Sequence, residues 1–144
     1  MKKMINTLLC CALAFLMLFS IISCSDTDKG KLTLADVKEN LEIYELKYTY
    51  EDEDLLGWEY EINEQFELDG YDLELEDSIK TIIRLKSTET YVFEFSSKKD
   101  AKNAEKVLKG WENESSYDEF SIVQSGSLVI FGEARIVSKL TSTD

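Results

Sequence analysis

The chain has 144 residues, carries a net charge of −13 at pH 7, and contains neither histidine nor proline. Without histidine it has no Ser-His-Asp or Cys-His catalytic group and no imidazole metal ligand. The excess of negative charge disfavours nucleic acid and anionic lipid headgroups as partners, and it favours cationic ones.

Residues 1–23 have the three-part layout of a secretory signal peptide. Two lysines give a positive start, a mostly apolar run follows, and the last residue before the cysteine is small. The tetrapeptide Ile21-Ile22-Ser23-Cys24 resembles the lipobox of bacterial lipoproteins, and the chain is similar in layout to small bacterial surface lipoproteins. This resemblance implies cleavage before Cys24, a diacylglyceryl thioether on its sulfur, and an acyl chain such as palmitate on the new amino terminus. It places the protein on the extracytoplasmic face of the bacterial cell membrane.

An uncleaved membrane anchor over residues 4–22 is the alternative interpretation, because this run approaches the ~20 apolar residues that span a bilayer. Asn6, Thr7 and Ser20 interrupt the run with polar side chains. In both interpretations the positive-inside rule keeps the amino-terminal lysines in the cytoplasm. The rest of the chain is therefore expected outside the membrane in either case.

After the signal peptide, the sequence predicts a polar tether at 24–32 and a single domain at 33–144. Cys10 and Cys11 lie in the segment that is removed, and Cys24 would carry lipid. No cysteine is then left for a disulfide or a thiolate site.

Acidic residues are concentrated between Glu51 and Asp77. This stretch contains 13 acids and no base, whereas residues 26–50 have a net charge of −2 and residues 78–144 have a net charge of zero. Such a run is most often a solvated surface. It also favours a cationic partner at short range, since screening limits the field to about 8 Å at physiological salt.

In the first half of the domain, the apolar pattern predicts one helix followed by strands. Apolar residues at helical spacing behind an N-cap at Thr33 predict a helix over 34–42. Alternation of apolar and polar residues predicts strands at 44–50, 58–62, 66–68 and 71–75, with turns at 51–57 and 69–70. Glu64 breaks the alternation, which we interpret as a bulge or turn at 63–65. A buried carboxylate with a raised pKa is the alternative.

In the second half, a hairpin, a helix, a second hairpin and a final helix are predicted. The first hairpin joins strands at 79–86 and 91–96, and the helix after it covers 98–109. The second hairpin joins strands at 120–124 and 128–132, and the final helix covers 133–140. The predicted fold class is α+β, an antiparallel sheet packed against the amphipathic helix at 98–109, with short N- and C-terminal helices. The acids of the predicted strands over 58–76 are expected to point away from the core.

A surface for a cationic partner is the principal candidate site. Its expected residues are Asp52, Asp54, Glu59, Glu61, Glu67, Asp72, Glu74 and Glu76. Trp58, Tyr60 and the tyrosines of 44–50 could form a stacking surface for a sugar or peptide, but their alternation favours core packing.

An EF-hand loop starting at Asp52 is excluded. Gly57 falls at position six as required, but Leu56 and Asn63 occupy positions five and twelve, which need oxygen ligands and a bidentate glutamate. We therefore expect no specific metal site.

Paired carboxylates on the predicted strands carry little information about catalysis. Glu59/Glu61 and Glu74/Glu76 would lie ~6.6 Å apart on a strand, within the ~6.5–9.5 Å typical of inverting glycosidases. Any alternating acidic strand gives this spacing, so no catalytic residue is assigned.

The sequence favours a noncatalytic, membrane-anchored binding or interaction protein with an acidic surface for a basic protein or peptide, without a cofactor and without nucleic acid as partner. An inhibitor or self-protection protein against a basic secreted enzyme is the alternative. In that case, a pull-down with this chain would still capture its partner at high salt. A carboxylate-dependent hydrolase is a remote alternative, which would need a cleft with carboxyls in unlike environments.

Overall fold

The computed structural model describes residues 31–114 and 119–142. These residues belong to a compact unit that starts at Lys31. Within this part of the chain, no helix combines the length and the apolar character needed to cross a membrane. In chain order the elements are α2 (Leu34–Ile43), β1 (Tyr48–Tyr50), the 3₁₀-helix η1 (Asp52–Asp54), α3 (Leu55–Leu68), β2 (Ile79–Leu85), β3 (Tyr91–Phe95), α4 (Lys98–Glu114), β4 (Phe120–Ser125), β5 (Leu128–Glu133) and α5 (Ala134–Leu140).

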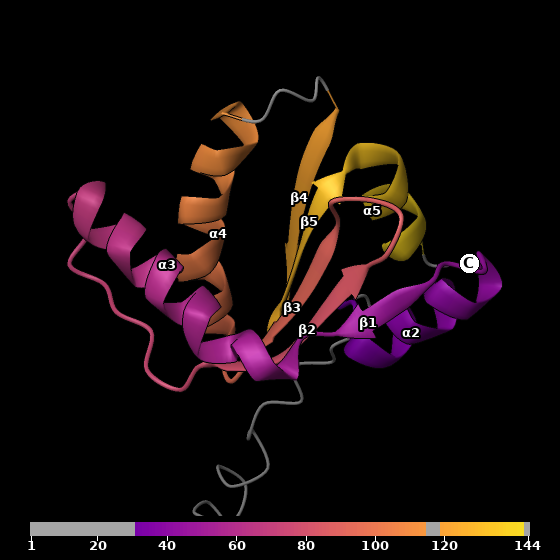
Figure 1. Cartoon of the computed structure of the whole chain (residues 1–144), viewed down its shortest axis with the longest axis horizontal. Helices are drawn as coiled ribbons and strands as arrows, with labels where there is room; N and C mark the ends of the chain where they lie inside the picture. The colour runs from indigo at the N-terminus through magenta and orange to yellow at the C-terminus, as the bar shows by residue number, and fades with distance from the viewer. Residues whose placement is uncertain (1–30, 115–118, 143–144) are drawn as a thin grey trace, which may run out of the picture. The chain divides into compact units, whose positions relative to one another are not determined.

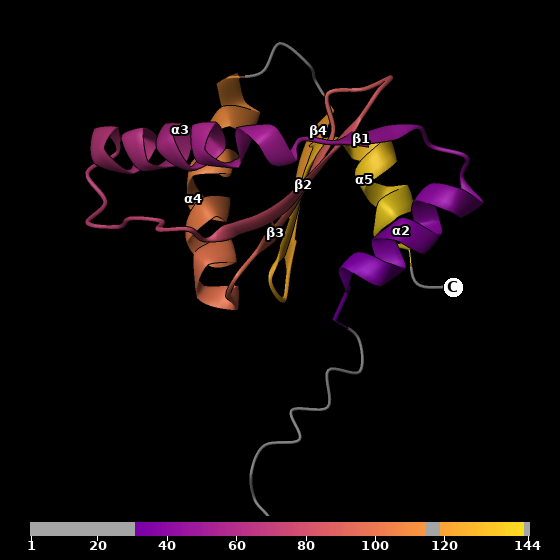
Figure 2. The same ribbon diagram turned by 60° about the horizontal axis from the view of Figure 1, so that its bottom comes forward.

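Five strands form one antiparallel sheet in the order β1-β2-β3-β5-β4. Ile83 pairs with Val92, and Val92 pairs in turn with Ile130, which sets the register across the middle of the sheet. Helices α3 and α4 pack on one face, and α2 and α5 pack on the other (Figure 1, Figure 2). The fold is therefore α+β, with α4 on one face of the sheet, as predicted.

Two hydrophobic clusters form the core, one on each face of the sheet. Because side chains alternate along a strand, Ile82 and Phe93 face α3 and α4, whereas their neighbours Ile83 and Val92 face α2 and α5. All four are fully buried, and full burial of such a side chain stabilises by roughly 1.5–3 kcal/mol. The described members of both clusters lie within residues 32–140, so the unit contains its own core and is expected to fold by itself.

Helix α2 begins where the sequence predicts, behind a reciprocal cap. The Thr33 N–H donates to Asp36 Oδ2 at 2.7 Å, and the Asp36 N–H donates to Thr33 Oγ1 at 3.3 Å. The hydrogen bond from the Thr33 side chain lowers the pKa of the Asp36 carboxyl below its ordinary value. Leu32, which the sequence assigned to the tether, is only 8% exposed and belongs to the cluster on the α2 side.

Both predicted hairpins and the last two helices are confirmed, with small shifts at their ends. Helix α4 begins at Lys98 but runs on to Glu114, so Gly110 lies inside the helix and does not end it. An added Cβ at Gly110 would meet no atom within 4 Å, which agrees with an exposed helical position.

The strands predicted at 58–62 and 66–68 are wrong. Both ranges belong to helix α3, and residues 71–75, also predicted as a strand, have no regular secondary structure. Trp58, Tyr60 and Ile62 fit a period of two, but Trp58 and Ile62 also fit a helical face together with Phe66. The helix buries Ile62 and Phe66 fully and leaves Tyr60 66% exposed. A strand would have placed all three of the alternating residues on one face.

Three further expectations need correction. Only Tyr48–Tyr50 of the predicted strand 44–50 is extended, because Tyr44 caps α2. The break predicted at 63–65 is absent, and Glu64 is an exposed helical residue. Glu59 does not point away from the core, since it is only 7% exposed.

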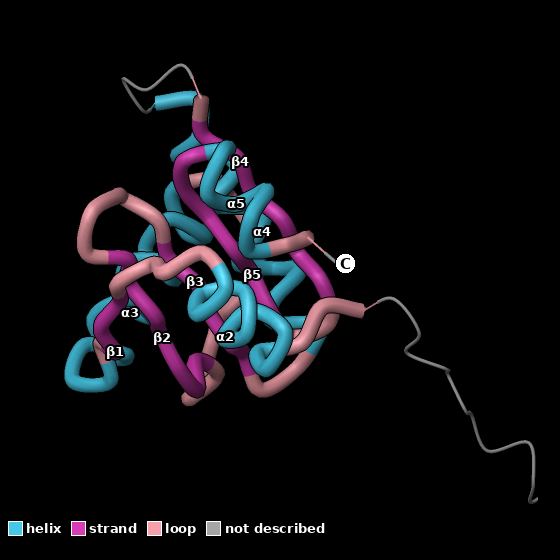
Figure 3. The backbone as a smooth tube through the Cα atoms, turned by 90° about the vertical axis from the view of Figure 1, so that its right-hand side faces the viewer, coloured by secondary structure: helices cyan, strands magenta, loops and turns pink. Residues whose placement is uncertain are grey.

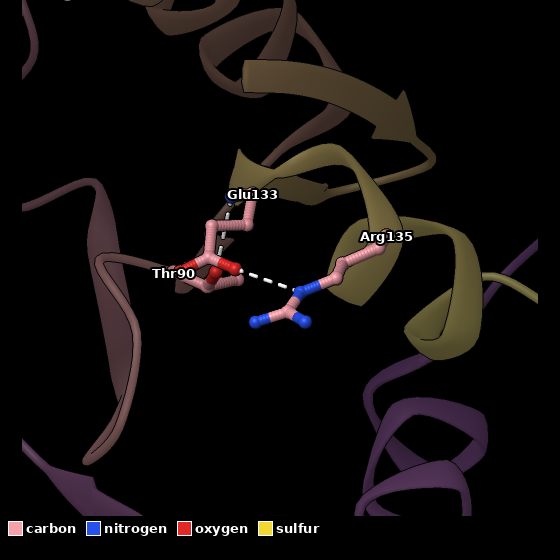
Figure 4. A network of polar contacts seen from close by, with 3 residues as sticks. All are labelled: Thr90, Glu133 and Arg135. Carbon is pink, nitrogen blue, oxygen red and sulfur yellow. Dashed lines mark hydrogen bonds and ion pairs between the residues drawn. The ribbon is translucent and has the colours of Figure 1, made fainter. Parts of the chain in front are cut away.

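The junction between β5 and α5 is fixed by a close contact with the β2–β3 hairpin. The Glu133 N–H donates to Thr90 Oγ1 at 3.2 Å, and Arg135 Nε donates to Glu133 Oε2 at 3.1 Å (Figure 4). Gly132 has a φ of +150°, and a Cβ there would lie 2.4 Å from Thr90 Oγ1. Only glycine allows the two segments to approach this closely.

Candidate functional site

The acidic stretch forms two antiparallel runs, helix α3 and the irregular segment 71–77 that returns beside it (Figure 1). Helix α3 ends in a turn in which the Gly70 N–H donates to Glu67 O at 3.1 Å and the Tyr71 N–H donates to Phe66 O at 2.8 Å. Gly70 has a φ of +74°, the left-handed conformation that glycine adopts after a helix. The predicted turn at 69–70 is thus real, but it ends a helix where a hairpin was expected.

Asn63 holds the returning segment against α3. Its Nδ2 donates to Leu75 O at 2.9 Å, and its Oδ1 accepts from the Leu75 N–H at 2.7 Å. One side chain therefore satisfies both backbone groups of Leu75, as a neighbouring strand would. The Leu75 side chain is 3% exposed and enters the cluster beneath α3 and α4.

Glu59 makes the second attachment, one helical turn earlier. Its Oε1 accepts hydrogen bonds from the Ser78 N–H and, at 2.6 Å, from the Ile79 N–H. Both donors belong to buried residues at the start of β2. Buried N–H groups need partners, and an ionised carboxylate accepts more strongly than a neutral group. Glu59 is therefore a structural residue that joins α3 to β2, and its Oε1 is occupied by two backbone donors.

Between these attachments and the turn lies an open groove of about 700 Å³, which we call the acidic groove. It is lined by Tyr60, Asn63, Glu64, Glu67, Gly70, Tyr71, Asp72, Leu73 and Glu74. Glu64 and Glu67 come from α3, at the spacing that puts both on the same side of the helix as Tyr60. Asp72 and Glu74 come from the returning segment. Four carboxylates and two phenol rings thus border one hollow, and no lining residue is basic.

The four carboxylates of the groove are exposed and carry unneutralised charge. The ion pairs seen among the described residues join Arg84 to Glu51, Lys109 to Glu105, and Arg135 to Glu133, and none of them reaches the groove. One cation, Lys106 of α4, lies over a tyrosine of the groove: its Nζ is 5.7 Å from the centre of the Tyr71 ring. Tyr71 is therefore already in contact with one ammonium group at the rim of the groove.

The structure brings together three of the eight acids expected to form a cationic-partner surface: Glu67, Asp72 and Glu74 all line the acidic groove. Glu61 and Glu76 are exposed but do not line it. Glu59 accepts hydrogen bonds from the backbone at the start of β2. The remaining two, Asp52 and Asp54, lie in η1, directly before α3.

Asp54, the residue directly before α3, borders a second, smaller hollow of about 420 Å³ with Tyr50, Glu51 and Glu53. Asp52 lies in η1, and its side chain is outside the described residues. In the part of the chain that the structure describes, no group of three or more carboxylates is placed to hold a metal ion. The four acids of the groove come from two segments, so its negative charge is spread over both walls.

Among the acidic and aromatic residues of the groove, three were not predicted as part of this site: Tyr60, Glu64 and Tyr71. Tyr60 was considered for a stacking surface, but core packing was favoured. Glu64 was treated as an irregularity in a strand, and Tyr60 and Tyr71 were assigned to strand faces. The helical spacing of Leu55, Ile62 and Phe66 could have revealed two of them, because a helix with these residues inside places Tyr60 and Glu64 outside. Tyr71 lies beyond the helix, and no comparable signal marked it.

No protein-family model, no curated protein and no solved structure matches this chain. The site is therefore interpreted from its geometry and chemistry alone.

Proposed function

We propose that the chain is a lipid-anchored, extracytoplasmic binding protein whose acidic groove holds a basic segment of another protein or a peptide. The observation that carries this proposal is the groove itself: four unneutralised carboxylates and two tyrosine rings around one hollow, without a basic lining residue. Carboxylates pair with lysine and arginine side chains, and phenol rings attract the same cations through their faces.

The attachments at Asn63 and Glu59 favour binding, because they hold the two walls of the groove in place before a partner arrives. A preorganised site loses less conformational entropy on binding than a mobile one. Charge on both walls also speeds the encounter with a cationic partner at low salt. The partner is expected to contribute lysine or arginine to the groove and apolar atoms to Tyr60, which is 66% exposed.

Affinity capture from the surface of the parent cell tests the proposal with two variants of equal net charge. The groove variant carries Glu64→Gln, Glu67→Gln, Asp72→Asn and Glu74→Gln. The matched variant carries Glu39→Gln, Glu42→Gln, Glu61→Gln and Glu76→Gln, all at exposed positions outside the groove.

Loss of capture in the groove variant and retention in the matched variant is the expected result. Equal loss in both variants would mean that net charge alone attracts the captured proteins, and the groove would have no specific function.

The lipid anchor is tested separately, by growing cells with labelled palmitate. The wild-type chain is expected to carry the label in the membrane fraction, and Cys24→Ser is expected to lose both the label and processing. An intact Met1 terminus in an unlabelled cytosolic protein would contradict the anchor without affecting the groove.

A further inference from the structure

Strand β4 is an uncharged edge strand, and among the described residues only its last residue has a neighbour on the open side: the Leu32 N–H donates to Ser125 Oγ at 3.0 Å. The strand lies at one end of the sheet, and its six residues include no charge, although 31% of the whole chain is charged. The other edge, β1, has only three residues, lies between Lys47 and Glu51, and is bordered by the Arg84–Glu51 ion pair at 3.3 Å. Natural edge strands are normally short, charged, bulged or covered. β1 meets this rule and β4 does not.

The register of β4 shows which of its backbone groups face outward. The Ala134 N–H donates to Glu119 O at 2.7 Å, and hydrogen-bonded pairs recur every second residue in an antiparallel ladder. Val123 therefore bonds to β5, whereas the N–H and C=O groups of Ile122 and Gln124 point to the free side. Among residues 31–114 and 119–142, no segment hydrogen-bonds to these outward groups. They form a short, open ladder.

We propose that β4 pairs antiparallel with β4 of a second copy of this chain, which joins two five-stranded sheets across a twofold axis at Val123. In this register Ile122 of each copy lies opposite Gln124 of the other, so all the outward groups of both residues are satisfied by each other. Val123 of one copy lies opposite Val123 of the other, at the closely spaced, non-hydrogen-bonded position. The strand is thus complementary to its own sequence, which a twofold interface requires.

The side chains of β4 support the same arrangement. Ile122 is half-buried against the cluster on the α4 side, and Val123 is half-buried against the cluster on the α5 side. A second strand alongside would cover the exposed part of both and continue each cluster into its counterpart. No charged residue faces another across the pair, so the cost of opposing like charges does not arise.

The strong negative charge of the chain does not oppose this pairing at close range. The acidic groove lies on α3 and segment 71–77, and α3 packs against β2 and α4, away from the β4 edge of the sheet (Figure 3). Residues 78–144, which include β4 and its neighbours, have equal numbers of acids and bases. Screening reduces repulsion between the acidic blocks beyond about 8 Å at physiological salt.

Disulfide trapping of the full chain in its own cells tests the register directly. With copper-phenanthroline added as oxidant, Val123→Cys should give a disulfide-linked dimer, since residues at closely spaced antiparallel positions fall within the ~4.4–6.8 Å Cα separation of a disulfide. Thr49→Cys places a thiol on the other edge strand and is the matched control, which should remain monomeric. Equal cross-linking of both variants, or of neither, overturns the proposal. So does a disulfide that joins the Val123→Cys variant to a different protein.

Sedimentation of the unit from Ser25 onward gives an independent measurement. Gln124→Pro removes an outward N–H that β5 does not use, at the kind of edge position where proline is tolerated. Because two hydrogen bonds per dimer are lost, the dimer should weaken by about tenfold or more. Far-UV circular dichroism should remain that of the wild type. A wild-type chain that is monomeric at every concentration, or a Gln124→Pro chain that is well folded and equally dimeric, contradicts the pairing.

Discussion

Replacing Glu59 with alanine removes the one carboxylate that the fold buries within the described part of the acidic stretch. In the wild type its Oε1 accepts from two backbone N–H groups, those of Ser78 and Ile79, and both residues are 5% exposed. Each hydrogen bond to a charged acceptor contributes about 1.5–3 kcal/mol, and a buried donor left without a partner costs about 1–3 kcal/mol. Since water can reach part of the site once the side chain is gone, we expect a loss of about 2–4 kcal/mol.

Such a loss is large relative to the roughly 5–15 kcal/mol that stabilises a domain of this size. Urea unfolding followed by tryptophan fluorescence measures this loss of stability. Trp58 and Trp111 report on it because they pack against the hydrophobic cluster on the α3 and α4 side of the sheet, with ring centres 6.4 Å apart. Glu59→Gln keeps an acceptor oxygen and should lose less than Glu59→Ala. Glu61→Ala, on the exposed side of the same helix, should change stability by no more than about 0.5 kcal/mol. If Glu59→Ala were as mild as Glu61→Ala, the structural role of Glu59 would be refuted.

Three further substitutions test other contacts. Asn63→Ala should release the returning segment, lower stability by about 1–3 kcal/mol, and increase amide exchange there; unchanged exchange would show that the amide side chain does not hold it. Gly132→Ala should destabilise by more than about 2 kcal/mol, because its Cβ would meet Thr90 Oγ1 at 2.4 Å at a φ of +150°; a wild-type melting temperature would contradict this close approach. The pKa of Asp36 is lowered by its bond from Thr33, so its stabilisation is present above the ordinary carboxyl pKa and is lost as pH falls through the lowered value. The difference in melting temperature between wild type and Asp36→Asn should therefore shrink on acidification, and a constant difference would argue against the capping bond.

The parts of the fold that the sequence predicted are those in which local pattern and tertiary packing agree. Helix α4 has one helical period behind a cap at Ser97, and its apolar residues Ala101, Ala104, Val107 and Leu108 are buried as the pattern implies. The two hairpins were recognised from apolar runs on either side of turn residues, although β2, β3 and β5 bury residues on both faces of the sheet. The apolar residues of the acidic stretch fit both the period of two of a strand and the period of a helix, because Trp58 and Ile62 are compatible with either. Burial of Phe66 and the buried bonds of Glu59 select the helix, and both depend on β2 and Leu75, which are distant in sequence. Local alternation contains no information about those contacts.

The sequence located the excess of acidic residues, but it did not show which of them share a groove. Charge counting placed the acidic surface between Glu51 and Asp77 without any knowledge of secondary structure. It could not separate the acids of the groove from Glu59, whose Oε1 is occupied by backbone donors. It also could not assign Glu64 to the groove, because the helical face that carries Glu64 was unknown.

We expect a cation to bind in the acidic groove and not over the acidic surface at large. Oligolysine added to the ¹⁵N-labelled unit, with each amide resonance followed, distinguishes the two. The expected shifts are concentrated on residues 60–74, disappear in the groove variant and persist in the matched variant. Shifts spread evenly over exposed acids such as Glu39 and Glu42, or equal in both variants, would contradict this expectation.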